Sequence, residues 1–533
     1  MMGVKLNLPT RPWVPQWLGI VTMFVVILPT VMLNGAYTGS MVEVSNTLGI
    51  LSEDITLGYY AASVGMAVAY PIVPKIRAVV TPKTLMLSDM FLQVLISLGC
   101  AHTSDIDIII ICSFFVGVLK AFIMLEFIVQ IRPLFSPKNI RSEFYAYFYP
   151  IVFAGGQISM VITAQLAYYY QWQYMYYFTI LLMLIAMVFI LLFFRYAQKP
   201  ISLPYRDIDF KSILLISCAL LFMIYVFTYG KALDWFNSTK IQIYAVAIPI
   251  LFYLFWKRQR TQNKPYISLK PLGHHKSIIG YFFMALVMFF SATSTLVISY
   301  MNSIIHVDSV HANTLNLFLL PGFIVGAFIC FWWFRWQRWR FRFLISFGMF
   351  CYVIYLAILY FGMAPNSTYE ILFLPMFFRG LGMMILFIAF GIFVVEDLEP
   401  RLMLSNAFFL ISFRSVLAPV LSASFFNNMI YSMQTKYVTI LSENITMTTP
   451  LAADRYNQAL SSALAQGHEF SQASQVATNS LNLLLQQQAL LLGLKSLIGG
   501  VLIMALVIAI ISRFIPFHKT IKVAVVKTGD DMV

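Results

Sequence analysis

FVGVLKAFIMLEFIV (residues 115–129) places Lys120 and Glu126 inside a run that is otherwise almost wholly apolar. A charge near the middle of a lipid bilayer costs about 2.5–3.5 kcal/mol on insertion scales, so such charges face a bundle interior or a watered cavity. Six residues turn a helix by about 600°, which points the two side chains to different faces. The stretch therefore predicts a membrane-spanning helix whose charges meet partners on other helices.

The composition agrees with this reading. Of 533 residues, 60% are hydrophobic and 11% charged, whereas soluble domains have about 45–50% and about 25%. Apolar stretches of about 20 residues, long enough to cross the hydrocarbon core, recur along the whole chain. We expect fourteen spans, near residues 15–38, 55–74, 84–102, 107–130, 144–168, 174–195, 212–231, 241–256, 277–301, 309–334, 343–363, 370–394, 403–430 and 490–512.

The loop charges predict the orientation. With both termini in the cytoplasm, 27 of the 35 Lys and Arg residues lie on inward segments and 4 on outward ones. This positive-inside bias accounts for the net charge of +14, which gives no support to nucleic-acid binding. The five cysteines lie in or at the ends of spans, and no cysteine or histidine spacing predicts a metal site or a cofactor.

The two halves of the chain share a pattern. Each half has a basic loop after its second span, PKIRAVVTPK (74–83) and RWQRWRFR (335–342), and one cation in its fourth span. Such parallel repeats build major-facilitator transporters. We therefore expect an all-α membrane protein of two six-helix bundles plus two inserted helices. The expected division is an N-terminal bundle at 1–200, the inserted pair with a cytoplasmic linker at 201–273, and a C-terminal bundle at 274–533.

Residues 431–489 predict an outside loop of about 59 residues, far longer than an ordinary helix connection. Its second part is rich in Ala, Leu and Gln and is interrupted at Gly467. This part is expected to form two helical pieces that extend from, or lie along, the membrane near the last span.

Several motifs together resemble one family. GKALDWFNST (230–239), Trp172 within an aromatic cluster, RGLG (379–382) and SFRSVLA (412–418) are similar, in this order, to the fourteen-span drug/proton antiporters of the EmrB/QacA type. The resemblance covers roughly residues 15–515. It implies the major-facilitator fold, export of small molecules, residence in the bacterial inner membrane, and a periplasmic adaptor and outer-membrane exit duct as partners.

The chain also departs from this family. Where the family has a Leu-Asp pair in its first helix, linked to proton or cation handling, this chain has Leu33 and Asn34. An amide does not titrate in the physiological range, so the first span cannot take up a proton there. The loop at 74–83 lacks the family's aspartate, and AGGQISMVITAQL (154–166) lacks its Gly-Pro motif.

Two carboxylates, Asp89 and Glu126, fall within the spans, both near a cytoplasmic end. The favoured interpretation is a gate network with Lys75, Arg77 or Arg132, whose salt bridges form and break as the halves rock. The alternative is proton carriage, for which Glu126 is the first choice and Asp89 the second.

Lys120, Arg379 and Arg414 lie deeper. Each is expected either to bind an anionic group of a substrate or to hold a backbone carbonyl or carboxylate within the bundle. Lys495, near the outer interface, is expected to snorkel.

Aromatic and methionine residues are abundant, with 48 Phe, 29 Tyr and 28 Met. Most should contact lipid or other helices, and a minority can line an adaptable hydrophobic cavity. Tyr37, one turn beyond Asn34, and Asn302 are the candidate polar contacts to a substrate, with Asn34 itself.

These features argue against an enzyme, because no nucleophile–base set or paired-carboxylate motif converges in the spans. No repeated pore loop predicts a channel. We expect a secondary exporter of hydrophobic or amphipathic small molecules. The alternative is an inner-membrane assembly component of a secretion complex with little transport of its own.

Overall fold

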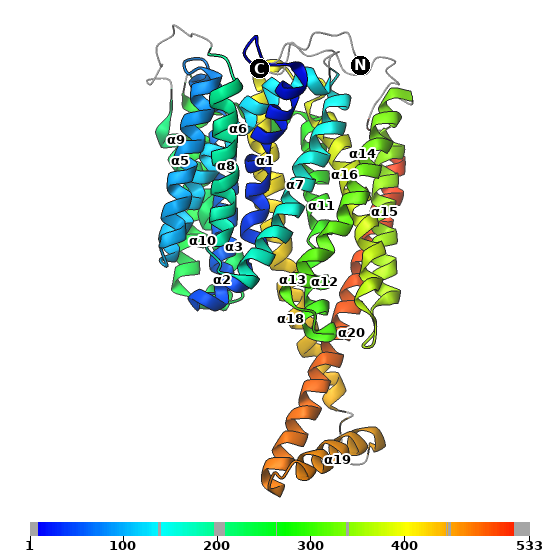
Figure 1. Ribbon diagram of the computed structural model, residues 1–533. Helices are drawn as coiled ribbons and strands as arrows, with labels where there is room; N and C mark the ends of the chain where they lie inside the picture. The colour runs from blue at the N-terminus through cyan, green and yellow to red at the C-terminus, as the bar shows by residue number, and fades with distance from the viewer. Residues whose placement is uncertain are drawn as a thin grey trace.

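The computed structural model describes residues 9–136, 140–196, 208–262, 264–336, 341–443, 445, 449–515 and 517, apart from the side chains of 34–37, 309 and 400. These residues form helices joined by short connections (Figure 1). The first half contains α1 (Gln16–Gly39), α2 (Met41–Leu48), α3 (Ser52–Ala69), α4 (Val73–Arg77), α5 (Pro82–His102), α6 (Ile106–Phe135), α7 (Arg141–Tyr169) and α8 (Tyr174–Phe193).

An inserted pair follows, and then the second half. The pair and its connections are α9 (Phe210–Tyr229), η2 (Trp235–Asn237), α10 (Thr239–Thr261) and η3 (Lys270–Gly273). The second half contains α11 (His275–Ser291), α12 (Ser294–Tyr300), η4 (Met301–Ile305), α13 (Ser309–Thr314), η5 (Leu315–Phe318), α14 (Leu319–Trp336), α15 (Phe341–Gly362), η6 (Tyr369–Leu372), α16 (Phe373–Val395), η7 (Pro400–Leu402), α17 (Met403–Ile411), η8 (Ser412–Leu417), α18 (Ala418–Ser442), α19 (Pro450–Ala465) and α20 (Phe470–Phe514).

All fourteen expected spans coincide with helix. Within the described ranges, thirteen helical segments are long and apolar enough to cross a membrane. The remaining expected span is α3, whose 18 residues begin with Glu53 and Asp54 and continue with many small side chains. Ten of the 18 residues of α3 are nevertheless buried. The expected all-helical membrane fold is confirmed.

The helices run between two ends of the molecule. α1 begins and α20 ends toward the same end, as an even number of crossings requires (Figure 1). We call this the terminal end. The opposite end carries α19, and we call it the hairpin end.

In each half the second and fourth membrane spans pack closely against each other: α3 with α6 in the first half, and α14 with α16 in the second. In the first half a Cβ on Gly117 of α6 would lie 1.9 Å from the carbonyl oxygen of Ala62 in α3. In the second half a Cβ on Gly322 of α14 would lie 2.3 Å from the carbonyl oxygen of Phe377 in α16. Glycine permits this backbone approach in membrane helices. The same device in equivalent helices supports the internal repeat that the sequence predicts.

The inserted pair contacts both halves at the hairpin end. α9 packs beside α3 and α18, and α10 is largely exposed. The Tyr229 hydroxyl donates to Asp54 at the start of α3. Trp235, within the GKALDWFNST motif, donates from Nε1 to Asn428 Oδ1 of α18 at 3.1 Å. The motif therefore ties the inserted pair to the second half.

The connection after α10 makes a similar bridge at the terminal end. The Tyr266 hydroxyl donates to the Val68 carbonyl of α3. The backbone N–H of Ser268 donates to Ser405 Oγ of α17 at 3.0 Å. The inserted pair is thus fastened to both halves.

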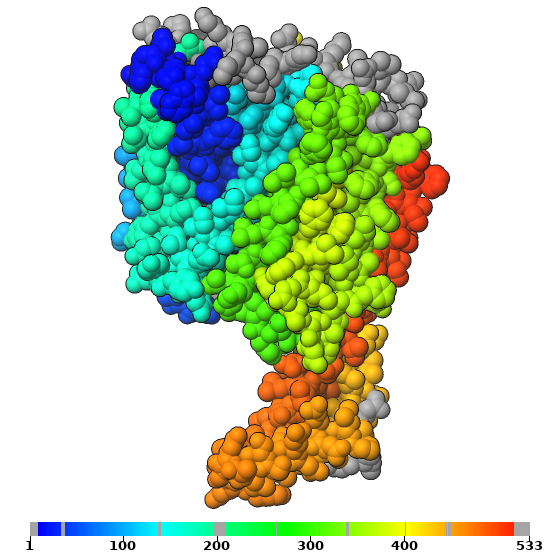
Figure 2. All heavy atoms as spheres, turned by 45° about the vertical axis from the view of Figure 1, so that its right-hand side comes forward, coloured from blue at the N-terminus to red at the C-terminus, as the bar shows by residue number. Residues whose placement is uncertain are grey.

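The expected loop at 431–489 is mostly helical, which corrects that expectation. α18 continues to Ser442, and α20 is a single helix of 45 residues that begins at Phe470. Figures 1 and 2 show both helices extending beyond the bundles, with α19 lying across the tip. The two predicted helical pieces are confirmed, and Gly467 lies at the break with φ of 90°. Ala463 of α19 and Ala473 and Ala477 of α20 are buried where the helices meet.

Candidate functional site

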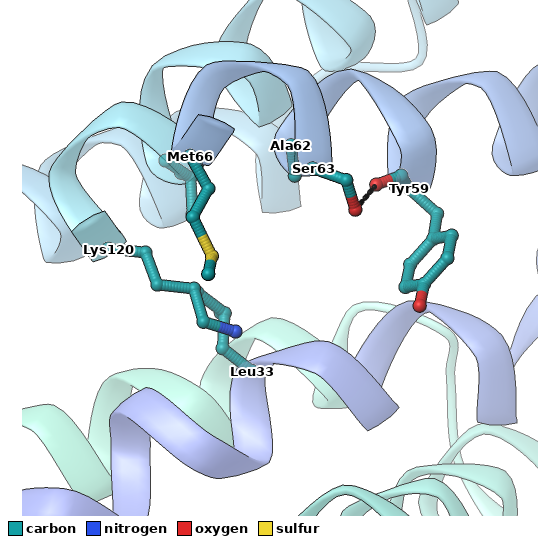
Figure 3. A pocket seen from close by; sticks show the side chains of 8 residues that line it. Leu33, Tyr59, Ala62, Ser63, Met66 and Lys120 are labelled. Carbon is teal, nitrogen blue, oxygen red and sulfur yellow. Dashed lines mark hydrogen bonds between the residues drawn. The ribbon is translucent and has the colours of Figure 1, made fainter. Parts of the chain in front are cut away.

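Lys120 projects into a small cavity inside the first half. Its side chain is 5% exposed, and the cavity, of about 20 Å³, has room for about one water molecule. Figure 3 shows Lys120 reaching from α6 past Met66 toward Leu33 of α1. The lining residues are Leu33, Tyr59, Ala62, Ser63, Met66, Val116, Gly117 and Lys120. The site is mainly apolar and is enclosed by α1, α3 and α6.

Glu126 lies on the same helix and is fully buried. Arg77 Nε donates to its Oε2 at 2.7 Å, and Gln130 Nε2 donates to its Oε1 at 2.8 Å. Both carboxylate oxygens are therefore engaged. Of the three basic residues expected nearby, Arg77 makes the ion pair.

Asp89 does not join this network, contrary to the expectation. It is 3% exposed, and its Oδ2 accepts a hydrogen bond at 3.2 Å from Gln93, one turn along α5. Its Oδ1 is buried and has no hydrogen-bond partner among the described residues. The two carboxylates that sequence reasoning treated as one network thus have different surroundings.

Arg379 is held inside the second half. It is 8% exposed, and its Nη2 donates to the carbonyl oxygen of Ser291 at 2.7 Å. Its Nη1 lies 3.6 Å from the sulfur of Met376, and its Nε is buried without a partner in the described part of the chain. This arrangement matches the expected alternative in which a cation holds a backbone carbonyl.

Arg414 lies in η8, a π-helical turn between α17 and α18. Its guanidinium carbon is 5.6 Å from the ring centroid of Phe387 in α16. Its Nε donates to Ser415 Oγ at 3.4 Å, near the limit of a hydrogen bond. The side chain is half-buried, where α3 of the first half meets η8.

The remaining candidates are dispersed. Asn302 lies in the π-helical turn η4, with an exposed side chain. Asn34 and Tyr37 lie on α1, but their side chains are outside the described residues. Lys495 is half-buried on α20. Of those whose side chains are described, neither Asn302 nor Lys495 lines the cavity at Lys120.

An aromatic seam between the halves was not singled out by sequence reasoning. Phe153 of α7 lies edge-to-face on Phe387 of α16, with centroids 4.7 Å apart, and 5.8 Å from Phe323 of α14. Tyr149 is 6.2 Å from Phe387 and stacks on Tyr145 at 5.2 Å. We call Tyr145, Tyr149, Phe153, Phe323 and Phe387 the aromatic seam. The spacing of four residues on α7 is the signal that could have located its first three members.

Two helix bundles meet along this seam, and a few charges are buried within or beside them. With the apolar helices described above, that arrangement defines a multi-pass membrane protein built of two helix bundles. Within the described ranges, no group of three His, Cys, Asp or Glu residues is placed to hold a metal ion.

The sequence pattern of the Major Facilitator Superfamily matches residues 21–423, and the chain belongs to this family. No curated protein sequence matches the chain.

Solved structures share the fold at low identity. A POT family transporter in complex with 5-aminolevulinic acid is 14% identical, has a TM-score of 0.55, and is matched over 93% of this chain and 97% of that one. A mutant of the peptide transporter POT is 12% identical with a TM-score of 0.54, over 95% and 97% of the two chains. Tetrameric PepTSo2 is 14% identical with a TM-score of 0.52, over 94% and 100%. These likenesses show the fold.

Proposed function

We propose that the protein is a secondary active exporter of hydrophobic or amphipathic small molecules, driven by an ion gradient. The observation that carries the proposal is the aromatic seam, because it presents large apolar rings where the two halves of a transporter meet. Aromatic side chains accept varied hydrophobic partners through stacking and edge contacts. The outward direction, and the drug/proton antiporter branch, rest on the ordered motifs that include GKALDWFNST.

Transport by the purified protein in proteoliposomes tests this proposal. A hydrophobic fluorescent dye should move when a pH or sodium gradient is imposed, and movement should stop when an ionophore collapses the gradient. Phe153→Ala should reduce the flux several-fold because it opens the seam. Phe361→Ala, which removes a ring that is 79% exposed on α15, is the matched control and should have no effect. A flux equal to that of empty liposomes would contradict the proposal.

Proton coupling is assigned to Asp89, with Glu126 now the second choice. A carboxylate held by Arg77 must break an ion pair to take up a proton, whereas Asp89 breaks none. Asp89→Asn should abolish flux driven by a pH gradient and spare downhill exchange of substrate. In the Glu126→Gln variant, the protein that folds should still transport substrate at a rate that depends on the pH gradient. The opposite result would return the role to Glu126.

The orientation is proposed with both termini in the cytoplasm of a bacterial cell and the hairpin end outside. Cysteines introduced at Ser442 and Ser471 should then react with an impermeant thiol reagent in intact cells, and one at Thr261 should not. Labelling at position 261 in sealed cells would reject this orientation.

A second candidate function is assembly with a periplasmic adaptor and an outer-membrane exit duct. The projecting hairpin favours it, because Leu451, Phe470 and Leu483 are 73%, 69% and 62% exposed there. Deleting residues 444–469 should impair export in cells and leave flux in proteoliposomes intact. Equal drug resistance at equal expression would contradict a docking role for the tip.

A further inference from the structure

Arg414 is placed by an irregular turn rather than by a regular helix. Residues Ser412–Leu417 form a π-helical turn between two α-helical segments. Such turns are uncommon and occur frequently at functional sites, since they shift one side chain out of the regular helical register. This turn sets a cation against helices of both halves.

The surroundings of Arg414 come from three elements: α16, the end of α3, and α7. Phe387 of α16 lies beneath its guanidinium group, as described above. Tyr70, at the end of α3, and Tyr145 and Tyr149 of α7 lie close enough for their hydroxyls to interact electrostatically with Arg414. The charge is therefore surrounded by rings and hydroxyls, and it adjoins the aromatic seam.

Among the residues that the structure describes, no carboxylate forms an ion pair with Arg414. Its Nε donates a long hydrogen bond to Ser415, and the Tyr149 hydroxyl is a second, neutral hydrogen-bonding neighbour. An arginine stays charged in proteins and is costly within a membrane unless it is paired or hydrated. Arg414 is half-buried, so part of the residue is accessible to solvent.

Arg379 provides the internal comparison. Its guanidinium group donates a hydrogen bond to the main-chain carbonyl of Ser291 at 2.7 Å, and both residues belong to the second half. Arg379 carries the charge that an anion site needs, but its side chain is buried and a ligand cannot reach it. The difference between the two arginines therefore lies in their partners and exposure, not in their residue type.

We propose that Arg414 binds the anionic group of the transported molecule. The preferred substrates are accordingly aromatic or hydrophobic molecules that carry a carboxylate. The guanidinium fork can bind a carboxylate through two parallel hydrogen bonds, and the rings of the aromatic seam contact the body of the molecule. The inference rests on the proposed function and names the substrate class for it.

The test uses three probes with one aromatic body: pyrenebutyric acid, its neutral amide, and pyrenebutylamine. Flux of each is measured in proteoliposomes with the full-length protein. Arg414→Gln should raise the KM for the acid about tenfold or more, since a hydrogen bond to a charged group contributes about 1.5–3 kcal/mol. The KM for the amide should not change, and this also shows that the variant has folded.

Two further variants complete the design. Arg414→Lys should restore part of the affinity for the acid, because it returns the charge without the fork. Arg513→Gln removes an exposed arginine at the terminal end and should leave all three fluxes unchanged.

The outcomes separate the two proposals. An equal change in KM for the acid and the amide in Arg414→Gln would overturn the anion site. Transport of the amide or the amine, but not the acid, by the unaltered protein would also overturn it while the exporter proposal stands. Transport of none of the three would reject the exporter proposal itself for this class of molecule.

Discussion

The interior of each helix bundle and the interface between the bundles are held by different interactions. Three of the ion pairs in the described ranges illustrate this, since each joins residues of a single body: the first half, the second half or the inserted pair. They are Arg77–Glu126 at 2.7 Å, Lys276–Glu396 at 3.1 Å and Arg258–Asp209 at 2.8 Å. Charge therefore stabilises the separate bodies.

Two hydrogen bonds across the interface have neutral acceptors and are longer than these ion pairs. At the terminal end Arg141 Nη1 donates to the Val395 carbonyl at 3.4 Å. At the hairpin end Asn313 Nδ2 donates to the Gly39 carbonyl at 3.2 Å. A typical hydrogen bond contributes about 0.5–1.5 kcal/mol, whereas breaking a buried ion pair costs about 3–5 kcal/mol. Breaking these two hydrogen bonds therefore costs less than breaking an ion pair inside one half.

The difference changes the expected role of the charged network. Arg77 and Glu126 belong to the same half, so their bond does not have to break when the halves move apart. The pair is better suited to fixing the loop after α3 against α6 than to gating. Four predictions test this contrast.

The largest effect is expected from Glu126→Gln. It leaves Arg77 facing an amide in a buried position and should cost about 3 kcal/mol, near the lower limit because Arg77 is 21% exposed and can regain water. The measurement is the free energy of unfolding, or the thermal midpoint, in detergent. Adding Arg77→Gln should recover part of the loss. If the double variant is simply the sum of the two singles, the pair is not coupled.

The next effect concerns packing within the first half. Gly117→Ala would force α6 away from the α3 backbone and should destabilise the protein by about 1–3 kcal/mol. Gly156→Ala is the control, since a Cβ there meets nothing within 4 Å. Thermal unfolding of the two variants side by side measures the difference. Equal midpoints would show that α3 and α6 can separate without loss.

A smaller effect is expected in the inserted pair. Although burial raises the pKa of Asp209, hydrogen bonds from Arg258 and Ser212 outweigh it and hold that pKa below its ordinary value. The contribution to stability is therefore complete above the ordinary value of 3.8 and is lost as the pH falls through the lower, folded-state pKa. Asp209→Asn should cost about 1 kcal/mol at pH 7, because Arg258 is 31% exposed, and much less in strong acid. A cost that does not vary with pH would refute the assignment.

The smallest effect on stability is expected at the interface. Asn313→Ala removes the hydrogen bond to Gly39 and should change the free energy of unfolding by less than about 1 kcal/mol. It should still shift the balance between closed and open forms at the hairpin end. Thiol labelling of a cysteine introduced beside the aromatic seam, with and without substrate, measures that shift. A large loss of stability with unchanged labelling would show that this hydrogen bond supports the fold and not the equilibrium between closed and open forms.

The sequence predicts the helices well because each span needs a long apolar run, and its charges mark the ends. It also predicts that Glu126 pairs with one of the basic residues Lys75, Arg77 or Arg132, since a buried carboxylate needs a cation and few are within reach. It does not distinguish Asp89 from Glu126. Both occupy similar depths, and only the packed structure shows which one Arg77 reaches.

The aromatic seam was not predicted from the sequence, for a reason that differs from the one given for Asp89 and Glu126. Rings are so common in this chain that the spacing of Tyr145, Tyr149 and Phe153 does not reveal which face of α7 meets the other half. The extension of α18 to Ser442 was not predicted, because its exposed part carries polar residues, which hydropathy assigns to loops, whereas the two helical pieces on either side of Gly467 were predicted. Helix continuity there depends on propensity and on Ala-rich packing with α19.

α20 gives the molecule a mechanical lever. It is one helix of 45 residues that packs along α15 and α18 and continues to the tip. The 20 residues from Phe470 to Ala489 form an arm of about 30 Å, so a tilt of the second half by about 10° would displace the tip by about 5 Å. A small tilt of the second half therefore produces a larger displacement at the tip of the hairpin than inside the bundles. A dye at the tip would report the transport cycle as a distance.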